Sequence, residues 1–102
     1  MFVNGAILTM NKVTFQGIDC SVRVSSYNNG QVNIQLFDEE GPYATASICL
    51  VGQELPQNYT AIKNYSENEG ILDALVEAGV VRYTGVKVAV GMVMVPIVEV
   101  LF

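Results

Sequence analysis

Histidine is absent from the sequence, which removes both the most common general base and the most common metal ligand. The two cysteines, Cys20 and Cys49, have no second sulfur at the spacing of a zinc site. The glycine patterns that hold phosphate groups, GxGxxG and GxxxxGK, are missing as well. These absences argue against an enzyme, and we expect neither a metal nor a cofactor.

Positive charge is scarce in this chain. Ten acidic residues face five cations, which gives a net charge of −5. The cations form no basic run and are scattered as Lys12, Arg23, Lys63, Arg82 and Lys87. Because affinity for DNA or RNA comes mainly from neutralised phosphates, we expect no wrapping of nucleic acid. An acidic surface is better suited to a basic groove on another protein.

The features of exported and membrane proteins are also missing. The sequence starts MFVNGAILTMNK, with no charged segment leading into a long apolar stretch, so no secretory signal is predicted. The apolar run near the C-terminus is too short for a membrane helix, which needs about 20 residues. Two cysteines make no disulfide framework for a chain of this length, and both fall in predicted strands. We therefore expect free thiols in a cytoplasmic protein.

The alternation of apolar and polar residues predicts strands in a single domain, residues 1–102. It is clearest in residues 18–26 and 31–37, and Asn29-Gly30 between them is a strong hairpin signal. Residues 43–51 make the next strand. Near the N-terminus, residues 6–10 and 13–15 are expected to pair as a short hairpin.

One segment has helical rather than strand periodicity. Ser66 and Glu69 fit a capping box, and Leu72 and Leu75 follow at helical spacing. Gly79 suits the left-handed position just past a helix end. The helix is thus expected at about residues 67–78. The predicted fold class is α+β, mainly an antiparallel sheet of about five to seven strands with this helix packed on it.

Residues 86–102 are almost wholly apolar and rich in valine, which predicts a strand or a strand pair after a turn at Thr84-Gly85. A strand that is apolar on both faces needs cover on both. We expect the helix to cover one face and a second copy of the chain to cover the other, which predicts a homo-oligomer. Alternation puts Ala89, Val93, Val95 and Ile97 on one face. It puts the candidate oligomer contact on the other, namely Val88, Val90, Met92 and Met94.

Two sets of polar residues are candidate binding sites. The segment 63–70 is an ordinary helix start or a binding site, since free amides at a helix start can hold an anion. Because Glu67 and Glu69 would oppose a phosphate there, an amine, a ribose or a base edge fits better. Arg82 beside Tyr83 is either an edge-strand arginine lying over the sheet or a pair that contacts a phosphate and stacks a base. The candidate ligand site consists of Arg82, Tyr83, Tyr65 and Asn68. The candidate partner face consists of Asp38, Glu39, Glu67 and Glu69. The alternative for the acidic turn at residues 38–40 is that its carboxylates only keep a loop solvated.

Three segments together resemble a family of small uncharacterised domains carried by bacteriophages and mobile elements of gut bacteria. These segments are YNNGQVNIQLFDEEGPYATASICL, KNYSENEGILDALVEAGVV and TGVKVAVGMVMVPIVEVLF. The resemblance lies in a SENEG-type helix start, a Thr-Gly turn and a final strand pair. The chain departs from the family where Val86, instead of a basic residue, follows Thr84-Gly85, and its tail is more apolar. The first departure puts a shared cationic site in doubt, and the second favours an oligomer.

The resemblance implies a counter-defence role in the host bacterial cytosol, by analogy of genomic setting alone. The leading hypothesis is a non-enzymatic, homo-oligomeric binding protein that sequesters a nucleotide immune signal. The first alternative is an anti-CRISPR-type inhibitor that presents its acidic face to a host nuclease. The second is a virion or other structural accessory protein with no ligand.

Overall fold

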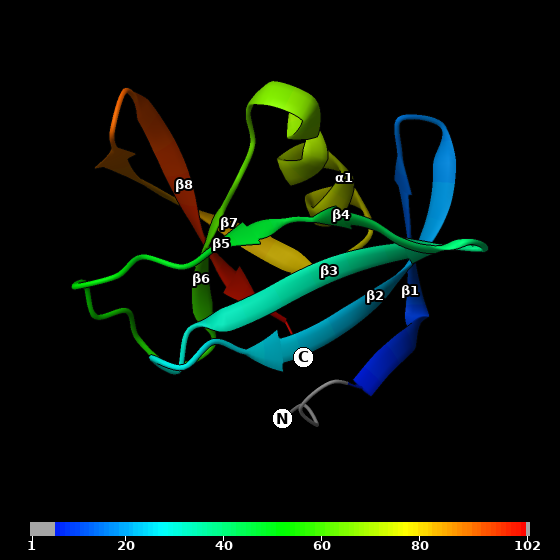
Figure 1. The fold of residues 1–102 in the computed structure, drawn as a ribbon, viewed down its shortest axis with the longest axis horizontal. Helices are drawn as coiled ribbons and strands as arrows, with labels where there is room; N and C mark the ends of the chain where they lie inside the picture. Colours follow the sequence, from blue (N-terminus) through cyan, green and yellow to red (C-terminus); the bar gives the residue numbers. More distant parts are fainter. Residues whose placement is uncertain (1–5, 102) are drawn as a thin grey trace.

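The computed structural model describes residues 6–101, of which residues 6–11 are described by their backbone alone. The described strands form two four-stranded antiparallel sheets (Figure 1). The first has the order β1-β2-β3-β4, with bounds Ala6–Phe15, Ile18–Ser26, Val32–Asp38 and Gly41–Thr45. The second has the order β5-β6-β8-β7, with bounds Ser47–Ile48, Tyr59–Ile62, Val93–Val100 and Val81–Val90. A 3-10 helix, η1 (Ser66–Asn68), and an α-helix, α1 (Ile71–Glu77), follow β6.

The α+β class is confirmed, but the described residues form eight strands in two sheets rather than five to seven in one. The strand expected at residues 43–51 divides at Ala46, which is buried. The Ala46 amide donates to the carbonyl of Ile34 in the first sheet, at 2.8 Å. Its carbonyl accepts from the amide of Lys63, which follows β6 in the second sheet, also at 2.8 Å. Ala46 therefore joins the two sheets where the sequence pattern suggested one strand.

The first two strands are joined at a place the sequence pattern did not indicate. The hairpin expected within residues 6–15 is wrong, because this segment is one strand, β1, that pairs with β2. The turn lies at Gln16-Gly17, where φ is 55° and 77°. Positive φ at both central residues is the geometry of a two-residue hairpin loop. The next hairpin, β2–β3, is confirmed, with Gly30 at φ 88° in its turn.

The helical segment starts later than predicted, and the capping box is wrong. α1 begins after Gly70, and Ser66 lies at φ 58° in η1 without a side-chain cap. The amide of Glu69 donates to the Ser66 carbonyl rather than to its hydroxyl. The amide of Leu72 donates instead to Oδ1 of Asn64, at 2.9 Å. A side chain outside the helix therefore satisfies one of the donors that a helix start leaves open.

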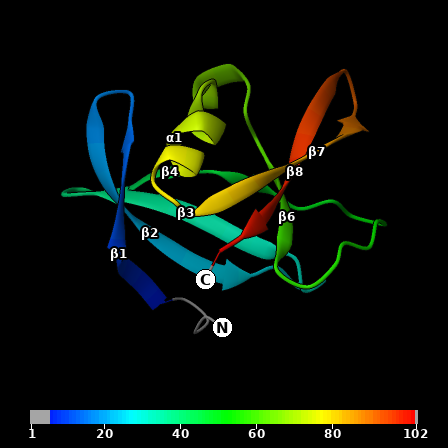
Figure 2. The same ribbon diagram turned by 180° about the vertical axis from the view of Figure 1, so that it is seen from behind.

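The other end of α1 and its packing agree with the sequence pattern. Gly79 has φ 75°, and the amide of Val80 donates to the Leu75 carbonyl at 3.0 Å, as in a Schellman motif. α1 packs against β1 and β7 and buries Ile71 and Leu75 (Figures 1 and 2). The main core thus lies between the sheets and the helix. It includes Val22, Val24, Ile34, Leu36, Ile62, Val81, Val98 and Val100.

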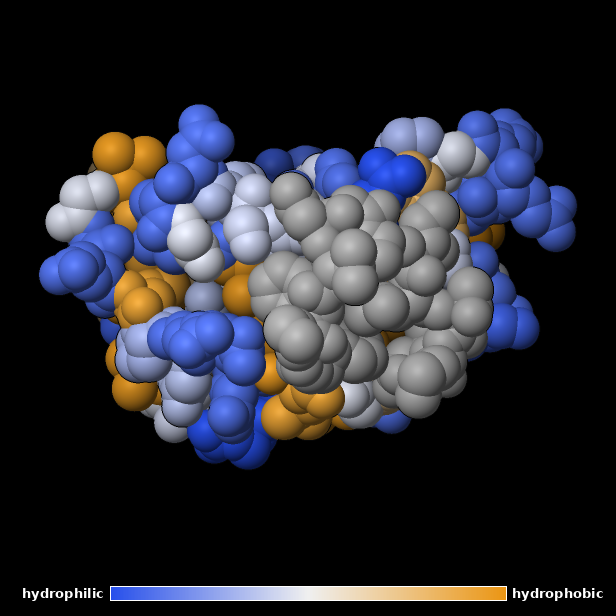
Figure 3. All heavy atoms as spheres, turned by 90° about the horizontal axis from the view of Figure 1, so that it is seen from below, coloured by the Kyte–Doolittle hydropathy of each residue, from blue (hydrophilic) through white to orange (hydrophobic). Residues whose placement is uncertain are grey.

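A second, smaller core lies under the β7–β8 hairpin. Its buried members are Leu50, Ala61, Val95 and Ile97, with Val88, Val90 and Val93 packed against them. Elsewhere, on the face seen from below, hydrophobic and hydrophilic residues are interspersed around the residues drawn in grey (Figure 3). Neither described helix is long and apolar enough to cross a membrane.

Candidate functional site

Arg82 and Tyr83 do not act as a pair, because neighbouring residues of a strand point to opposite faces. Nε of Arg82 donates to Oε1 of Glu99 at 2.9 Å, across the β7–β8 register, and this carboxylate raises the pKa of the arginine. Tyr83 is half-buried and packs against the main core. A ligand that binds Arg82 would therefore not contact the ring of Tyr83, and it would compete with Glu99 for the guanidinium of Arg82.

Tyr65 and Asn68, the other two candidates, line a hollow of about 550 Å³ beside β4 and β5. Asn68 is buried, and its Nδ2 donates to the Thr45 carbonyl at 2.8 Å. Nζ of Lys63 lies in the same hollow, 5.7 Å from the centre of the Tyr65 ring. The structure therefore keeps half of the predicted ligand site together and adds Lys63, which belonged to the candidate segment 63–70 but not to the predicted site residues. Arg82 and Tyr83 are not among the residues that line this hollow.

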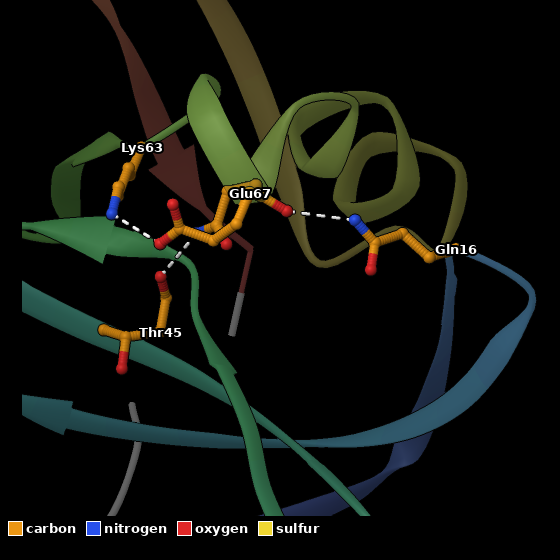
Figure 4. Close-up of polar contacts among 5 residues, drawn as sticks. Gln16, Thr45, Lys63 and Glu67 are labelled. Carbon is orange, nitrogen blue, oxygen red and sulfur yellow. Dashed lines mark hydrogen bonds and ion pairs between the residues drawn. The ribbon is translucent and has the colours of Figure 1, made fainter.

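Glu67, a candidate of the partner face, is tied into the same region (Figure 4). Its Oε2 accepts from Nζ of Lys63 at 2.6 Å, and this bond lowers the pKa of Glu67 and raises that of Lys63. Its carbonyl accepts from Nε2 of Gln16, at 2.9 Å, in the β1–β2 turn. The hydroxyl of Tyr43 donates to Oε1 of the same glutamine at 2.8 Å. Gln16 of the β1–β2 turn and Lys63, which follows β6, thus hold Glu67 of η1 in place, and Tyr43 of β4 positions Gln16.

Asp38 and Glu39 lie at the β3–β4 turn, in a different hollow of about 440 Å³. Asp19 and Lys12 line it too, with their charged atoms 4.0 Å apart. Glu40 extends the acidic surface into an adjoining hollow that contains Asp19, Asp38 and Glu39. The sequence analysis missed Asp19, because it is brought to the turn by the pairing of β2 with β3 rather than by any local pattern. We call Asp19, Asp38, Glu39 and Glu40 the acidic end.

The predicted partner face is therefore divided. Asp38 and Glu39 belong to the acidic end, whereas Glu67 lines the hollow of Tyr65, and Glu69 is exposed just before α1. Oδ1 of Asp38 accepts from the amide of Glu40 at 2.8 Å, which fixes the turn between β3 and β4. Asp38 and Glu39 thus line one hollow and Glu67 lines another, whereas Glu69 is not among the lining residues of either.

Most of the cations among the described residues are already engaged. Arg82 and Lys63 are in the ion pairs given above, and Lys12 is near Asp19. The guanidinium of Arg23 lies 4.5 Å over the ring of Phe37. Little positive charge is left for an anionic ligand, whereas the hollows of the acidic end are lined by four carboxylates and one cation, Lys12.

Cys20 lines the hollow at the acidic end but is not suited to be a nucleophile. Burial raises the pKa of its thiol, and the carboxylates of Asp38 and Asp19 raise it further. A thiol with a raised pKa is protonated at neutral pH, and the thiolate is the reactive form.

The predicted oligomer contact does not form one face. β7 and β8 are joined by the two-residue loop Gly91-Met92, so even-numbered residues of β7 lie opposite odd-numbered residues of β8. Val88 and Val90 pair with Val95 and Val93 over the second core. Met94 pairs with Ala89 on the other face and is 57% exposed, while Met92 is fully exposed in the loop.

Thr84-Gly85 is also not a turn. β7 runs through it from Val81 to Val90, with a register shift between Tyr83 and Lys87. Gly85 has φ 86° in this bulge, and the Thr84 hydroxyl donates to the Ile97 carbonyl at 2.7 Å. The final strand pair expected from the sequence is present, but its loop lies at Gly91-Met92.

No family model, curated protein or solved structure matches the chain, so the case for its function rests on its own residues.

Proposed function

We propose that the chain is a non-enzymatic binding protein whose acidic end docks on a basic surface of a partner protein. The observation that carries this proposal is the gathering of four carboxylates, Asp19, Asp38, Glu39 and Glu40, around adjoining hollows with Lys12 as the neighbouring cation. Complementary charge of this kind speeds association and selects partners.

The setting we propose is counter-defence in a bacterial cytosol, which is what the sequence resemblance implies. A nuclease that binds nucleic acid needs a positively charged groove for the phosphates. The acidic end offers carboxylates where such a groove would otherwise hold phosphates. In this mechanism the chain inhibits the nuclease by occupying its groove.

The experiment compares two double variants that remove the same amount of negative charge. Asp38→Asn with Glu39→Gln neutralises the acidic end, and Asp73→Asn with Glu77→Gln neutralises the exposed side of α1. Each variant is titrated by calorimetry with an arginine-rich peptide and added to DNA cleavage assays of RNA-guided nucleases. We expect the first to weaken peptide binding by about tenfold and to abolish inhibition, because charge at the contact matters more than total charge.

The α1 variant is expected to behave like the wild type within about twofold at moderate salt, where distant charges are screened. Equal losses in both variants would show that only total charge matters. Absence of both peptide binding and nuclease inhibition in the wild type would remove the proposal.

A second candidate, sequestering of a nucleotide immune signal, is favoured by one observation. The hollow of about 550 Å³ combines the ring of Tyr65 with Nζ of Lys63, which suits a base and a phosphate. Calorimetry with cyclic and ADP-ribose-type nucleotides tests it, with Lys63→Ala and Arg82→Ala as matched variants. Heat that disappears in Lys63→Ala alone supports this hollow, and heat that disappears in Arg82→Ala supports the site predicted from the sequence. No heat from the wild type removes this candidate.

A further inference from the structure

The outer edge of β7 faces no other strand of the described chain. β7 is the last strand of its sheet and pairs with β8 on one side. In antiparallel pairs, residues that bond to the neighbour alternate with residues whose N–H and C=O point away. The Val90–Val93 pair closes a two-residue loop and is therefore a bonded pair, as is Val88–Val95. The backbone groups of Lys87 and Ala89 consequently point to the open edge.

Pro96 separates the end of this hairpin from the rest of the sheet. β6 pairs with β8 at Ala61–Ile97, and the pairing stops before Pro96. Pro96 has no N–H to donate, and it lies on β8 two residues before Val98, which pairs with Thr60. Beyond this point β7 and β8 continue as a two-stranded ribbon, at one end of the molecule (Figures 1 and 2).

The other edges described with their side chains are protected. On β4, Pro42 has no amide and the Thr45 carbonyl is occupied by Asn68. β5, the opposite edge of the second sheet, has two residues. Proline, covering side chains and short edge strands limit pairing with another chain. The end of β7 has an exposed Lys87 and follows the Gly85 bulge, but between Lys87 and Val90 it has no proline and is not short like β5. Val86, directly after the bulge, is 54% exposed.

An apolar hollow of about 350 Å³ borders the same edge. One wall is formed by Ala89 and Val90, and the other by the loop after β5. That loop contributes the side chain of Val51, which is 89% exposed. The loop residues that line the hollow are Cys49, Leu50, Val51 and Gln53.

We propose that a second copy of this chain pairs antiparallel with β7, edge to edge, with Val88 opposite Val88 of the second copy. In this register the backbone groups of Lys87 bond to those of Ala89 of the second copy, and the reverse. Val86 of the second copy then lies beside Val90, at the apolar hollow. The β5-β6-β8-β7 sheets of the two copies become one eight-stranded sheet. The apolar hollow is filled only when the second copy is present.

A second copy fits this edge because the contact is self-complementary: antiparallel pairing around a two-fold axis brings the same donors and acceptors to each side. Lys87 faces alanine rather than the other Lys87, so like charges are not opposed. The acidic β3–β4 turn lies at the far end of the molecule from the ribbon (Figures 1 and 2). The two negatively charged ends therefore stay apart in the dimer. This arrangement limits the electrostatic repulsion between two chains that each have a net charge of −5.

The first experiment uses the amide of Ala89, which points away from β8. Ala89→Pro removes this donor and adds a ring at the edge without breaking a bond to β8. Ala89→Ser is the matched control, because it keeps the amide. Light scattering at micromolar concentration is expected to give twice the 11.1 kDa chain mass for the wild type and Ala89→Ser. Ala89→Pro is expected to give the mass of one chain with an unchanged circular dichroism spectrum.

The second experiment tests the register even if Ala89→Pro fails to fold. In a Cys49→Ser background, Val88→Cys is expected to form a disulfide-linked dimer on oxidation, because facing residues of a non-bonded pair lie close enough. Ala89→Cys in the same background is the control and is expected to stay uncrosslinked. A wild type that is monomeric at these concentrations overturns the proposal. So does crosslinking of Ala89→Cys in place of Val88→Cys.

Discussion

Gln31 fastens the loop after β5 to the first sheet, and its removal is the most quantitative test of the fold. It is 4% exposed and lies directly before β3. Its Nε2 donates to the carbonyls of Leu50 and Gln53, both at 3.0 Å. Its Oε1 accepts from the amide of Leu50 at 2.8 Å. We predict that Gln31→Met, which keeps the length of the side chain and removes all three bonds, destabilises the protein strongly.

The magnitude follows from the three bonds. At a net contribution of about 1 kcal/mol each, their loss costs about 3 kcal/mol. The buried Leu50 amide loses its partner, which places the value at the upper end of such changes. For a domain of this size, 1 kcal/mol corresponds to about 4–8 °C in Tm, so a decrease of about 12–24 °C is expected.

The assay is urea unfolding followed by circular dichroism, with Gln57→Met as the control. Gln57 is exposed in the loop before β6, and its replacement is expected to change the free energy of unfolding by less than about 0.5 kcal/mol. A loss below about 1 kcal/mol in Gln31→Met would refute the reasoning, because water would then satisfy the loop as well as the glutamine does.

Three further predictions concern single side chains. Ser66→Gly should stabilise the fold by about 1 kcal/mol in thermal unfolding, because it relieves a left-handed residue at φ 58°, whereas a capping role would make it neutral or worse. The bond from Lys63 lowers the pKa of Glu67, so the stability that this bond contributes is present above pH 4.5, the ordinary pKa of the glutamate, and is lost as the pH falls below that value. Glu67→Gln should therefore flatten the decrease in Tm on the acid side. In native protein at pH 8, iodoacetamide should label Cys49 before Cys20, as mass spectrometry of peptides would show, and equal rates would contradict the burial of Cys20.

Local signals in the sequence predicted the parts of the fold that depend on near neighbours. The alternation in β2 and the Asn29-Gly30 turn are enough to specify a hairpin, because each strand lies next to the other in sequence. Gly79 ends α1 as expected, since a helix end needs a left-handed residue at one position.

Signals that depend on distant residues could not be read in this way. Asn64 satisfies an amide eight residues away, outside any capping pattern, so Ser66 was the better candidate by spacing alone. The face of Met94 depends on the length of the loop at Gly91-Met92, since a two-residue loop exchanges odd and even positions.

The same division applies to the candidate site. Asp38 and Glu39 were found because they are adjacent acids in a turn, whereas Asp19 joins them only through the pairing of β2 with β3. Arg82 was singled out for its neighbour Tyr83, but its contact is Glu99, placed opposite by the β7–β8 register. Strand alternation was the available signal that Arg82 and Tyr83 point apart.

The position of β8 between β6 and β7 affects the order in which a ribosome-bound chain can fold. The first sheet consists of residues 6–45, in which every strand pairs with its neighbour in sequence, so it can form while synthesis continues. The second sheet has to wait for Val93–Val100, because β6 and β7 pair with β8 and not with each other. Until then the apolar strand β7 is without a partner and is a surface for chaperones to bind. A nascent chain arrested before residue 93 should therefore protect the amides of β2 and β3 from hydrogen exchange and leave those of β6 and β7 unprotected.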